Sequence, residues 1–132
     1  MLQANDITQV IYDTRDKQHH LETNGDLLTS KTASFFNYIC VSPKDIKTLK
    51  RLDFMEGKFR LFNSVDYDVK VVTDLDLSKD MIKYATMLMP LTTNNTQRDK
   101  EIQQDVWNYC IKHNIKYTPR IHRDVWGNKM NI

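Results

Sequence analysis

The sequence predicts an α/β protein with a mostly parallel sheet and flanking helices. Strand-like segments alternate along the chain with helix-like segments, which is the order of β/α units. The strand-like segments are nearly continuous apolar runs, typical of strands that are covered on both faces. A length of 132 residues, with 40% apolar and 27% charged residues, suits one globular domain. We therefore expect a single domain that covers residues 1–132.

The first elements expected are a helix and a short strand. Asn5 is a candidate N-cap, and the apolar residues behind it recur at helical spacing as far as Ile11. Residues 19–22 then have the pattern of a short strand, which runs into a turn at residues 23–25. A loop rich in threonine and serine follows.

The clearest β/α unit lies in residues 35–52. Residues 35–41 form an apolar run rich in aromatic and β-branched side chains, which predicts a buried strand. Ser42 and Pro43 then have the residue types preferred at an N-cap and at the first position of a helix. Beyond this unit, the apolar residues of the segment 53–66 recur with no sustained helical or strand spacing. The apolar stripe of the expected helix consists of Ile46, Leu49 and Leu52.

The second half of the chain continues the alternation of strands and helices. Its strongest helix signal is one face formed by Ile102, Val106, Tyr109, Cys110 and His113. The other expected elements are strands at residues 67–73, 87–91 and 115–122, a short helix capped by Asp76 or Ser78, and a turn at Gly127 and Asn128.

Charge and the rare residues exclude several classes of function. A net charge of +2 is too small to predict nucleic-acid binding. The 3 glycines lie far apart, so neither a dinucleotide-binding turn nor a phosphate-binding loop can be written. Cys40 and Cys110 cannot form a four-ligand zinc site or hold an iron–sulfur cluster by themselves. We expect two reduced, buried thiols in a cytoplasmic protein, since the sequence shows no signal peptide or membrane-spanning run.

Polar residues gather where the predicted strands end, which is where chemistry lies in parallel β/α proteins. Residues 22–25 offer a carboxylate, a hydroxyl and an amide, although a capped turn explains them more simply. Ser42 and Lys44 place a hydroxyl and an ammonium at the expected helix N-terminus. They could hold an anion there, or they could be a cap and an exposed lysine. The remaining strand ends are residues 90–92 and 119–123.

Among the histidines, His122 is the one that suggests a site. On the predicted strand it shares a face with Arg120, although an exposed basic strand explains the pattern as well. His19 and His20 alternate faces on a strand, so they cannot bind one metal together. His113 is explained by a favourable charge at a helix C-terminus. Spacing alone reveals no nucleophile–base pair and no metal cluster.

Four segments at these strand ends resemble the second part of the 7-carboxy-7-deazaguanine synthases, a radical S-adenosylmethionine family. In order they are LETNG at 21–25, YICVSPK at 38–44, MPL at 89–91 and PRIHRDVWGN at 119–128. The resemblance covers nearly the whole chain and is weakest in residues 53–66. It implies that the fold is the C-terminal portion of an abridged radical S-adenosylmethionine (β/α) barrel.

The resemblance also implies a reaction, the magnesium-aided rearrangement of 6-carboxy-tetrahydropterin to 7-carboxy-7-deazaguanine, on the route to queuosine and related deazapurines. In the family a [4Fe–4S] cluster cleaves S-adenosylmethionine reductively, and the resulting 5′-deoxyadenosyl radical abstracts a substrate hydrogen. By position, Thr23 and Gly25 would line the pterin pocket, and His122 would contact the pterin. Ser42 and Lys44 would hold the ribose or carboxylate side of S-adenosylmethionine. The complete enzyme would need S-adenosylmethionine, the cluster and Mg²⁺.

The sequence lacks the family's C-x-x-x-C-x-x-C cluster loop and its G-G-E-P motif. We therefore expect a partial domain that is inactive alone and needs an N-terminal half-chain to supply the cluster. The strand through Leu21 would then lie at an edge of the sheet. Two alternatives stay open, an inert fragment and a standalone module that binds a pterin or a nucleobase. A homodimer, common in the family, is a further expectation, and no contact with a membrane or directly with nucleic acid is expected.

Overall fold

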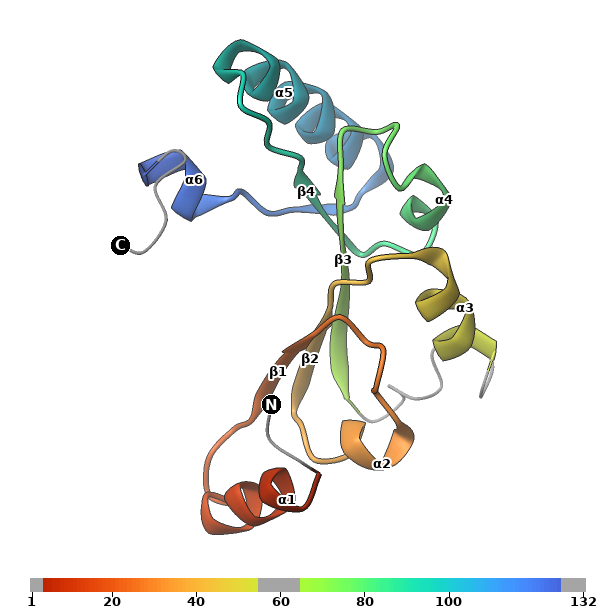
Figure 1. Ribbon diagram of the computed structural model, residues 1–132, viewed down its shortest axis with the longest axis vertical. Coiled ribbons are helices and arrows are strands. Elements are labelled where there is room, and N and C mark those ends of the chain that lie inside the picture. Colours follow the sequence, from red (N-terminus) through yellow and green to blue (C-terminus); the bar gives the residue numbers. More distant parts are fainter. Residues whose placement is uncertain (1–3, 55–64, 127–132) are drawn as a thin grey trace. The chain divides into compact units, whose positions relative to one another are not determined.

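The computed structural model describes residues 4–54 and 65–126 and has the expected α/β architecture (Figure 1). β1 pairs with β2, β3 with β4 and β4 with β5, all in parallel, and the strand order is that of the chain. The predicted fold class is therefore confirmed. The turn expected at residues 127–128 lies outside the described residues. The elements are α1 (Ala4–Asp13), β1 (His20–Thr23), α2 (Ser30–Ala33), β2 (Tyr38–Val41), α3 (Ile46–Phe54), β3 (Asp66–Thr73), α4 (Lys79–Ile82), β4 (Met87–Pro90), α5 (Thr96–His113), β5 (Lys116–Tyr117) and α6 (Ile121–Trp126).

The chain divides into two compact units, Met1–Asp68 and Val69–Ile132, and the boundary falls within β3. β1 and β2 belong to the first unit, and β4 and β5 belong to the second, so each unit contains a parallel pair of its own. Within residues 4–54 and 65–126, no helix is both long and apolar enough to cross a membrane.

The core of the first unit is shared by β2 and α3. Ile39 and Val41 on β2 are fully buried, and so are Leu49 and Leu52 on α3. An atom placed at the Cβ position of Gly25 would touch both Val41 and Leu52, so the two elements lie side by side. The two leucines belong to the predicted apolar stripe, and their burial is what holds the helix against the strands.

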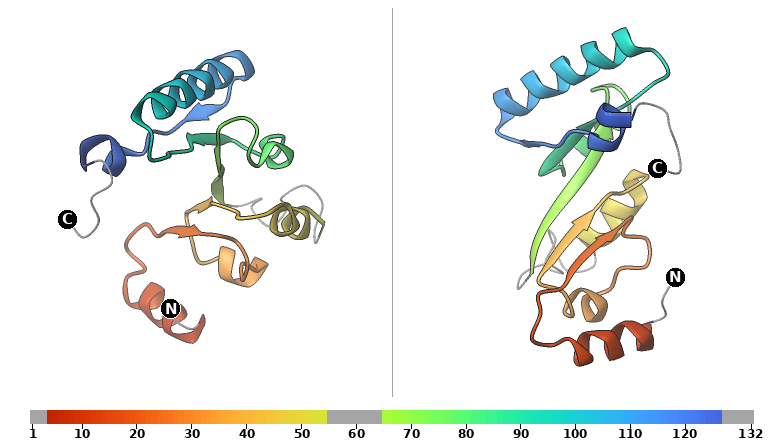
Figure 2. Two further views of the ribbon diagram at one scale, coloured as in Figure 1. Left: turned by 45° about the horizontal axis from the view of Figure 1, so that its top comes forward. Right: turned by 90° about the vertical axis from the view of Figure 1, so that its left-hand side faces the viewer.

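β1 lies at an edge of the sheet, as expected for the strand through Leu21. α1 precedes it and lies near the amino ends of β1 and β2 (Figure 2). α1 begins at Ala4, so Asn5 lies within the helix and the prediction that it is the N-cap is wrong.

Only the second part of the apolar run at residues 35–41 is a strand. The amides of Phe35 and Phe36 donate to the carbonyls of Thr32 and Ala33, in the turn that follows α2. These main-chain bonds hold the first residues of the run in a turn, so β2 begins at Tyr38. The short helix α2, capped by the Thr29 side chain, lies within the segment that was expected to be a loop.

The second unit has α5 packed against β4 and β5 (Figure 1). β3 and β4 confirm the strands expected at residues 67–73 and 87–91. Val71 of β3 lies opposite Leu88 of β4, and both side chains are fully buried. The predicted apolar face of α5 is confirmed except at its end, where His113 is exposed. The buried residues of this face are Ile102, Val106 and Cys110.

The strand predicted at residues 115–122 is wrong in its second half. β5 covers only Lys116–Tyr117, and α6 occupies Ile121–Trp126. Pro119 has no N–H group to donate to a neighbouring strand, so it does not continue the ladder. The Asp124 amide donates to the Arg120 carbonyl at 2.9 Å, which is a helical bond. Arg120 and His122 therefore do not share a strand face.

Candidate functional site

The first candidate site lies at the carboxyl ends of β1 and β2. Thr23 lies opposite Val41 in the parallel register, so residues 23–25 and 42–44 leave the sheet at the same edge. The Ser42 amide donates to the Thr23 carbonyl at 2.7 Å and extends the ladder beyond the strands. The structure thus brings together two of the segments that were predicted to carry ligand contacts.

Gly25 lies in a tightly packed turn of this site. Its φ of +86° lies in the left-handed region that glycine adopts most easily. The Arg51 guanidinium donates to the carbonyl oxygens of Gly25 and Leu28. The Gly25 amide donates to the Thr23 hydroxyl at 3.1 Å, and that hydroxyl still has its own proton to donate. The turn is therefore held by α3 and by its own side chains.

The helix that follows β2 begins later than the sequence suggested. α3 starts at Ile46, so neither Ser42 nor Pro43 begins it. Asp45 takes the capping role, because its Oδ1 accepts a hydrogen bond from the Thr48 amide at 3.1 Å. The serine and proline have residue types that are also common in loops, and the aspartate nearer to the helix is the better placed acceptor. Ser42 is partly buried in the connection.

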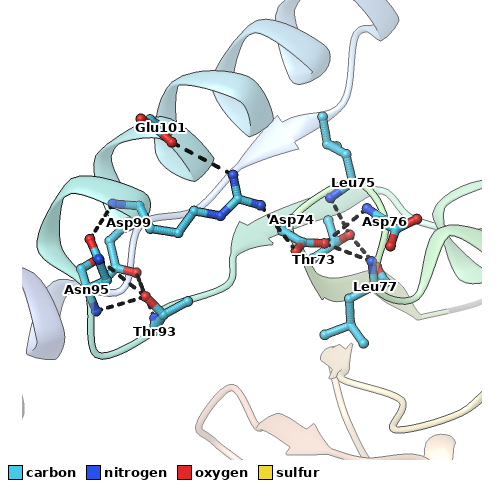
Figure 3. Close-up of polar contacts among 10 residues, drawn as sticks. Thr73, Asp74, Leu75, Asp76, Leu77, Thr93, Asn95, Asp99 and Glu101 are labelled. Atoms are coloured by element: carbon cyan, nitrogen blue, oxygen red, sulfur yellow. Dashed lines mark hydrogen bonds and ion pairs between the residues drawn. The ribbon is translucent and has the colours of Figure 1, made fainter.

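The second unit gathers polar side chains after β4 (Figure 3). Asn95 caps α5, because its side chain accepts a hydrogen bond from the Arg98 amide at 2.9 Å. Asp99 Oδ1 accepts hydrogen bonds from both the amide and the hydroxyl of Thr93, each at 2.7 Å. These contacts tie the loop after β4 to the first turn of α5.

Asp74 organises the loop after β3 (Figure 3). Its Oδ1 accepts hydrogen bonds from the amides of Leu77 at 2.8 Å and Asp76 at 3.0 Å. These bonds lower the pKa of the Asp74 carboxyl below its ordinary value, and the charge of Arg98 adds to the effect. The Arg98 side chain lies 3.8 Å from Asp74 Oδ2 and 3.8 Å from Glu101 Oε2.

Replacing Asp74 with alanine should destabilise the protein by about 1 kcal/mol near neutral pH, because two loop amides lose their acceptor. A carboxyl whose pKa is lowered in the folded protein contributes stability above its unfolded pKa of about 4 and loses it as the pH falls. Chemical denaturation should therefore show a smaller difference between Asp74→Ala and wild type at about pH 3 than at neutral pH. Asp76→Ala is the control, since that side chain is 92% exposed. A difference independent of pH would contradict this role for Asp74.

A polar cleft of about 440 Å³ lies between the amino-terminal part of α5 and α6. It is at the carboxyl end of β4, where parallel α/β proteins usually bind ligands. His122 is exposed on α6, next to the cleft residue Arg123. The lining includes Thr92, Thr93, Asp99, Lys100, Arg123 and Asp124.

Sequence reasoning missed Asp74, Thr93 and Asp99. The signal for Asp99 was local, because an aspartate in the first turn of a helix favours the helix N-terminus. Asp74 directly follows a strand, and aspartate is common in turns because its side chain accepts bonds from its own loop. Neither signal indicates that Asp99 bonds to Thr93 in the cleft wall or that Asp74 lies near Arg98.

The described residues contain no group of three or more side chains that could bind a metal ion. His19 lies 2.7 Å from the Thr14 hydroxyl, so its ring has a structural hydrogen-bond partner. Cys40 and Cys110 are both buried, as predicted. Burial raises the pKa of the Cys110 thiol, which keeps this group protonated.

No family model matches the chain, and neither a curated protein nor a solved structure matches it.

Proposed function

We propose that the chain is the C-terminal portion of a 7-carboxy-7-deazaguanine synthase-like radical S-adenosylmethionine enzyme. The complete enzyme would convert 6-carboxy-tetrahydropterin to 7-carboxy-7-deazaguanine for queuosine or a related deazapurine. The observation that best supports this proposal is the main-chain bond of 2.7 Å between Ser42 and Thr23. It makes the ETNG and SPK segments neighbours at the carboxyl edge of a parallel pair, where β/α enzymes hold their ligands.

In this proposal Thr23 and Gly25 contribute to the pterin pocket. The Thr23 hydroxyl accepts a hydrogen bond from the Gly25 amide and can donate its own proton to a pterin nitrogen or oxygen. Gly25 would contribute the shape of the turn, since its amide and carbonyl already bond to Thr23 and Arg51 and the space for a side chain is taken by Val41 and Thr48. By the resemblance, His122 would also contact the pterin in the complete enzyme.

Ser42 and Lys44 are proposed to bind S-adenosylmethionine. Lys44 is exposed just beyond the end of β2, so its ammonium can reach a ligand carboxylate. The Ser42 hydroxyl would bond to the ribose, while its amide stays bound to the Thr23 carbonyl. The role of these residues is thus to bind and orient the nucleoside next to the pterin.

The residues present do not fit the [4Fe–4S] cluster. The chain has 2 cysteines, both buried, whereas the family's C-x-x-x-C-x-x-C loop supplies three thiolates. The proposal therefore assigns the cluster to residues outside these 132, on an N-terminal half-chain. Mg²⁺ would likewise belong to the complete enzyme, since the described part of the chain offers no group of three metal ligands.

Reconstitution with a second polypeptide tests the proposed function. The chain is purified anaerobically alone and together with a polypeptide that carries the C-x-x-x-C-x-x-C and G-G-E-P motifs. Both samples receive iron, sulfide, a reductant, S-adenosylmethionine, Mg²⁺ and 6-carboxy-tetrahydropterin. We expect the pair to form 7-carboxy-7-deazaguanine and the lone chain to form none. Cleavage of S-adenosylmethionine by the lone chain would refute the assignment of the cluster, and a soluble, cluster-loaded pair without product would favour an inert fragment.

Variants of the reconstituted pair test the residue roles. Lys44→Ala should weaken the affinity for S-adenosylmethionine about tenfold, because a charge-assisted contact is lost. Lys47→Ala, at an exposed position of α3, should leave it unchanged. His122→Ala should weaken pterin affinity, whereas His113→Ala, exposed on α5, should not. Calorimetry measures both affinities, and equal effects of target and control would contradict the assigned roles.

A further inference from the structure

α6 gains little stability from the core of the second unit. None of its 6 residues is buried, and Ile121 and Val125 are 67% and 64% exposed. A helix of this length is not stable by itself in water. Its position must therefore come from specific contacts with the neighbouring elements.

Arg120 makes a well-formed contact of this kind. Its Nη1 donates to the Thr92 hydroxyl at 2.7 Å in a partly buried position. Arg120 immediately precedes α6, and Thr92 follows the buried end of β4, so the bond sets where the helix begins. A second contact joins Gln103 Nε2 to Asp124 Oδ1 at 3.5 Å, which is long and correspondingly weak.

We propose that Arg120 is a positioning residue whose bond to Thr92 seats α6 beside the polar cleft. The bond holds Arg123 and Asp124 in the cleft wall and keeps His122 next to it. A planar guanidinium that donates to a partly buried acceptor favours one geometry, so the helix is oriented as well as attached. The effect on the pterin rests on the proposed function, whereas the seating of α6 requires no ligand.

Trp126 reports the seating of α6 directly, because it lies in that helix. The chain has 2 tryptophans, so in a Trp107→Phe background the fluorescence comes from Trp126. Thr92→Val removes the acceptor at nearly constant volume, and Thr92→Ser keeps it. We expect Thr92→Val to lower the fluorescence anisotropy and to raise quenching by acrylamide, with Thr92→Ser like its parent. Equal signals from these two variants would overturn the inference.

Variants of Arg120 show whether the two residues act through one bond. Arg120→Met should change the Trp126 signal as Thr92→Val does. Arg120→Lys keeps a donor, so its Trp126 signal should lie between that of Arg120→Met and that of the parent. The double variant Arg120→Met/Thr92→Val should be no worse than either single variant, because both changes remove the same bond. Additive effects would overturn the inference.

Calorimetry then connects the seating of α6 to the ligand. With the reconstituted pair, Thr92→Val and Arg120→Met should each weaken the binding of 6-carboxy-tetrahydropterin about tenfold, and Thr92→Ser should not. Unchanged affinity in variants whose Trp126 signal has moved would overturn the link to ligand binding. If Trp126 responds as expected but the parent pair binds no pterin, the seating of α6 is supported and the proposed function fails.

Discussion

Replacing Gly25 with alanine should lower the free energy of unfolding by about 3 kcal/mol. The φ of +86° costs an L side chain about 1–2 kcal/mol. The added Cβ would also lie 2.9 Å from Val41 Cγ1 and 3.1 Å from Thr48 Cγ2, and both distances are shorter than an ordinary van der Waals contact. Crowding of a packed core costs a further 1–3 kcal/mol, roughly. Urea denaturation followed by circular dichroism measures the loss.

Two controls separate backbone strain from crowding at Gly25. Leu27→Ala should be nearly neutral, because the Leu27 side chain is 73% exposed. In a Val41→Ala background Gly25→Ala should cost less, since the colliding Cγ1 is gone while the cost of the backbone angle remains. An equal cost in both backgrounds would show that contact with Val41 is not the cause.

Tyr38→Phe should destabilise the protein by about 2 kcal/mol near neutral pH. The Tyr38 hydroxyl donates to Asp68 Oδ2 at 2.7 Å, and Asp68 is only 3% exposed. Removing the hydroxyl deprives a buried carboxylate of a donor, and burying a charge without sufficient hydrogen bonds is costly. Chemical denaturation measures the difference. Tyr12→Phe, at a position that is 64% exposed, is the control and should have little effect.

The same bond should leave a signature at high pH. Burial raises the pKa of Tyr38 well above its ordinary value of about 10, and the bond to Asp68 raises it further. A group with a higher pKa in the folded protein contributes stability that is complete below the unfolded pKa and is lost as the pH rises above it. Stability should therefore fall above about pH 10.

This decline at high pH should be smaller in Tyr38→Phe than in the wild type. Part of it should remain, because burial also raises the pKa of Tyr117 and Cys110. Denaturation midpoints measured across the alkaline range give the slope for each protein. An unchanged slope in Tyr38→Phe would exclude Tyr38 as a source of the decline.

The strands and the longest helix could be predicted from their apolar residues, which form continuous runs in the strands and recur at helical spacing in α5. Val71 and Leu88 are buried members of apolar runs, and Val106 lies on the buried face of α5. Residues 35–36 are as apolar as the strand that follows them, and only the main-chain bonds of the turn after α2 distinguish the two. Pro119 was the available signal that β5 would stop early.

The polar ends of the strands could also be predicted, but their contacts could not. Thr23 and Ser42 were expected at the same edge, because parallel strands end on the same side of a sheet. The bond between Arg120 and Thr92 joins residues that are 28 positions apart and depends on where α6 begins. Because a strand was predicted through His122, α6 was not expected, and no pattern in the sequence indicated the bond between Arg120 and Thr92.

The link between Thr23 and Ser42 uses an amide and a carbonyl, groups that every residue except proline supplies in full. The side chains at these two positions can therefore change without breaking the frame that holds the two segments together. Gly25 has no such freedom, because its missing side chain is what lets the turn close over α3. The site thus combines one position that tolerates a single residue type with neighbours whose chemistry is open to variation. Under the proposed function, the ligand contacts made by positions 23 and 42 are therefore open to change while the backbone stays the same.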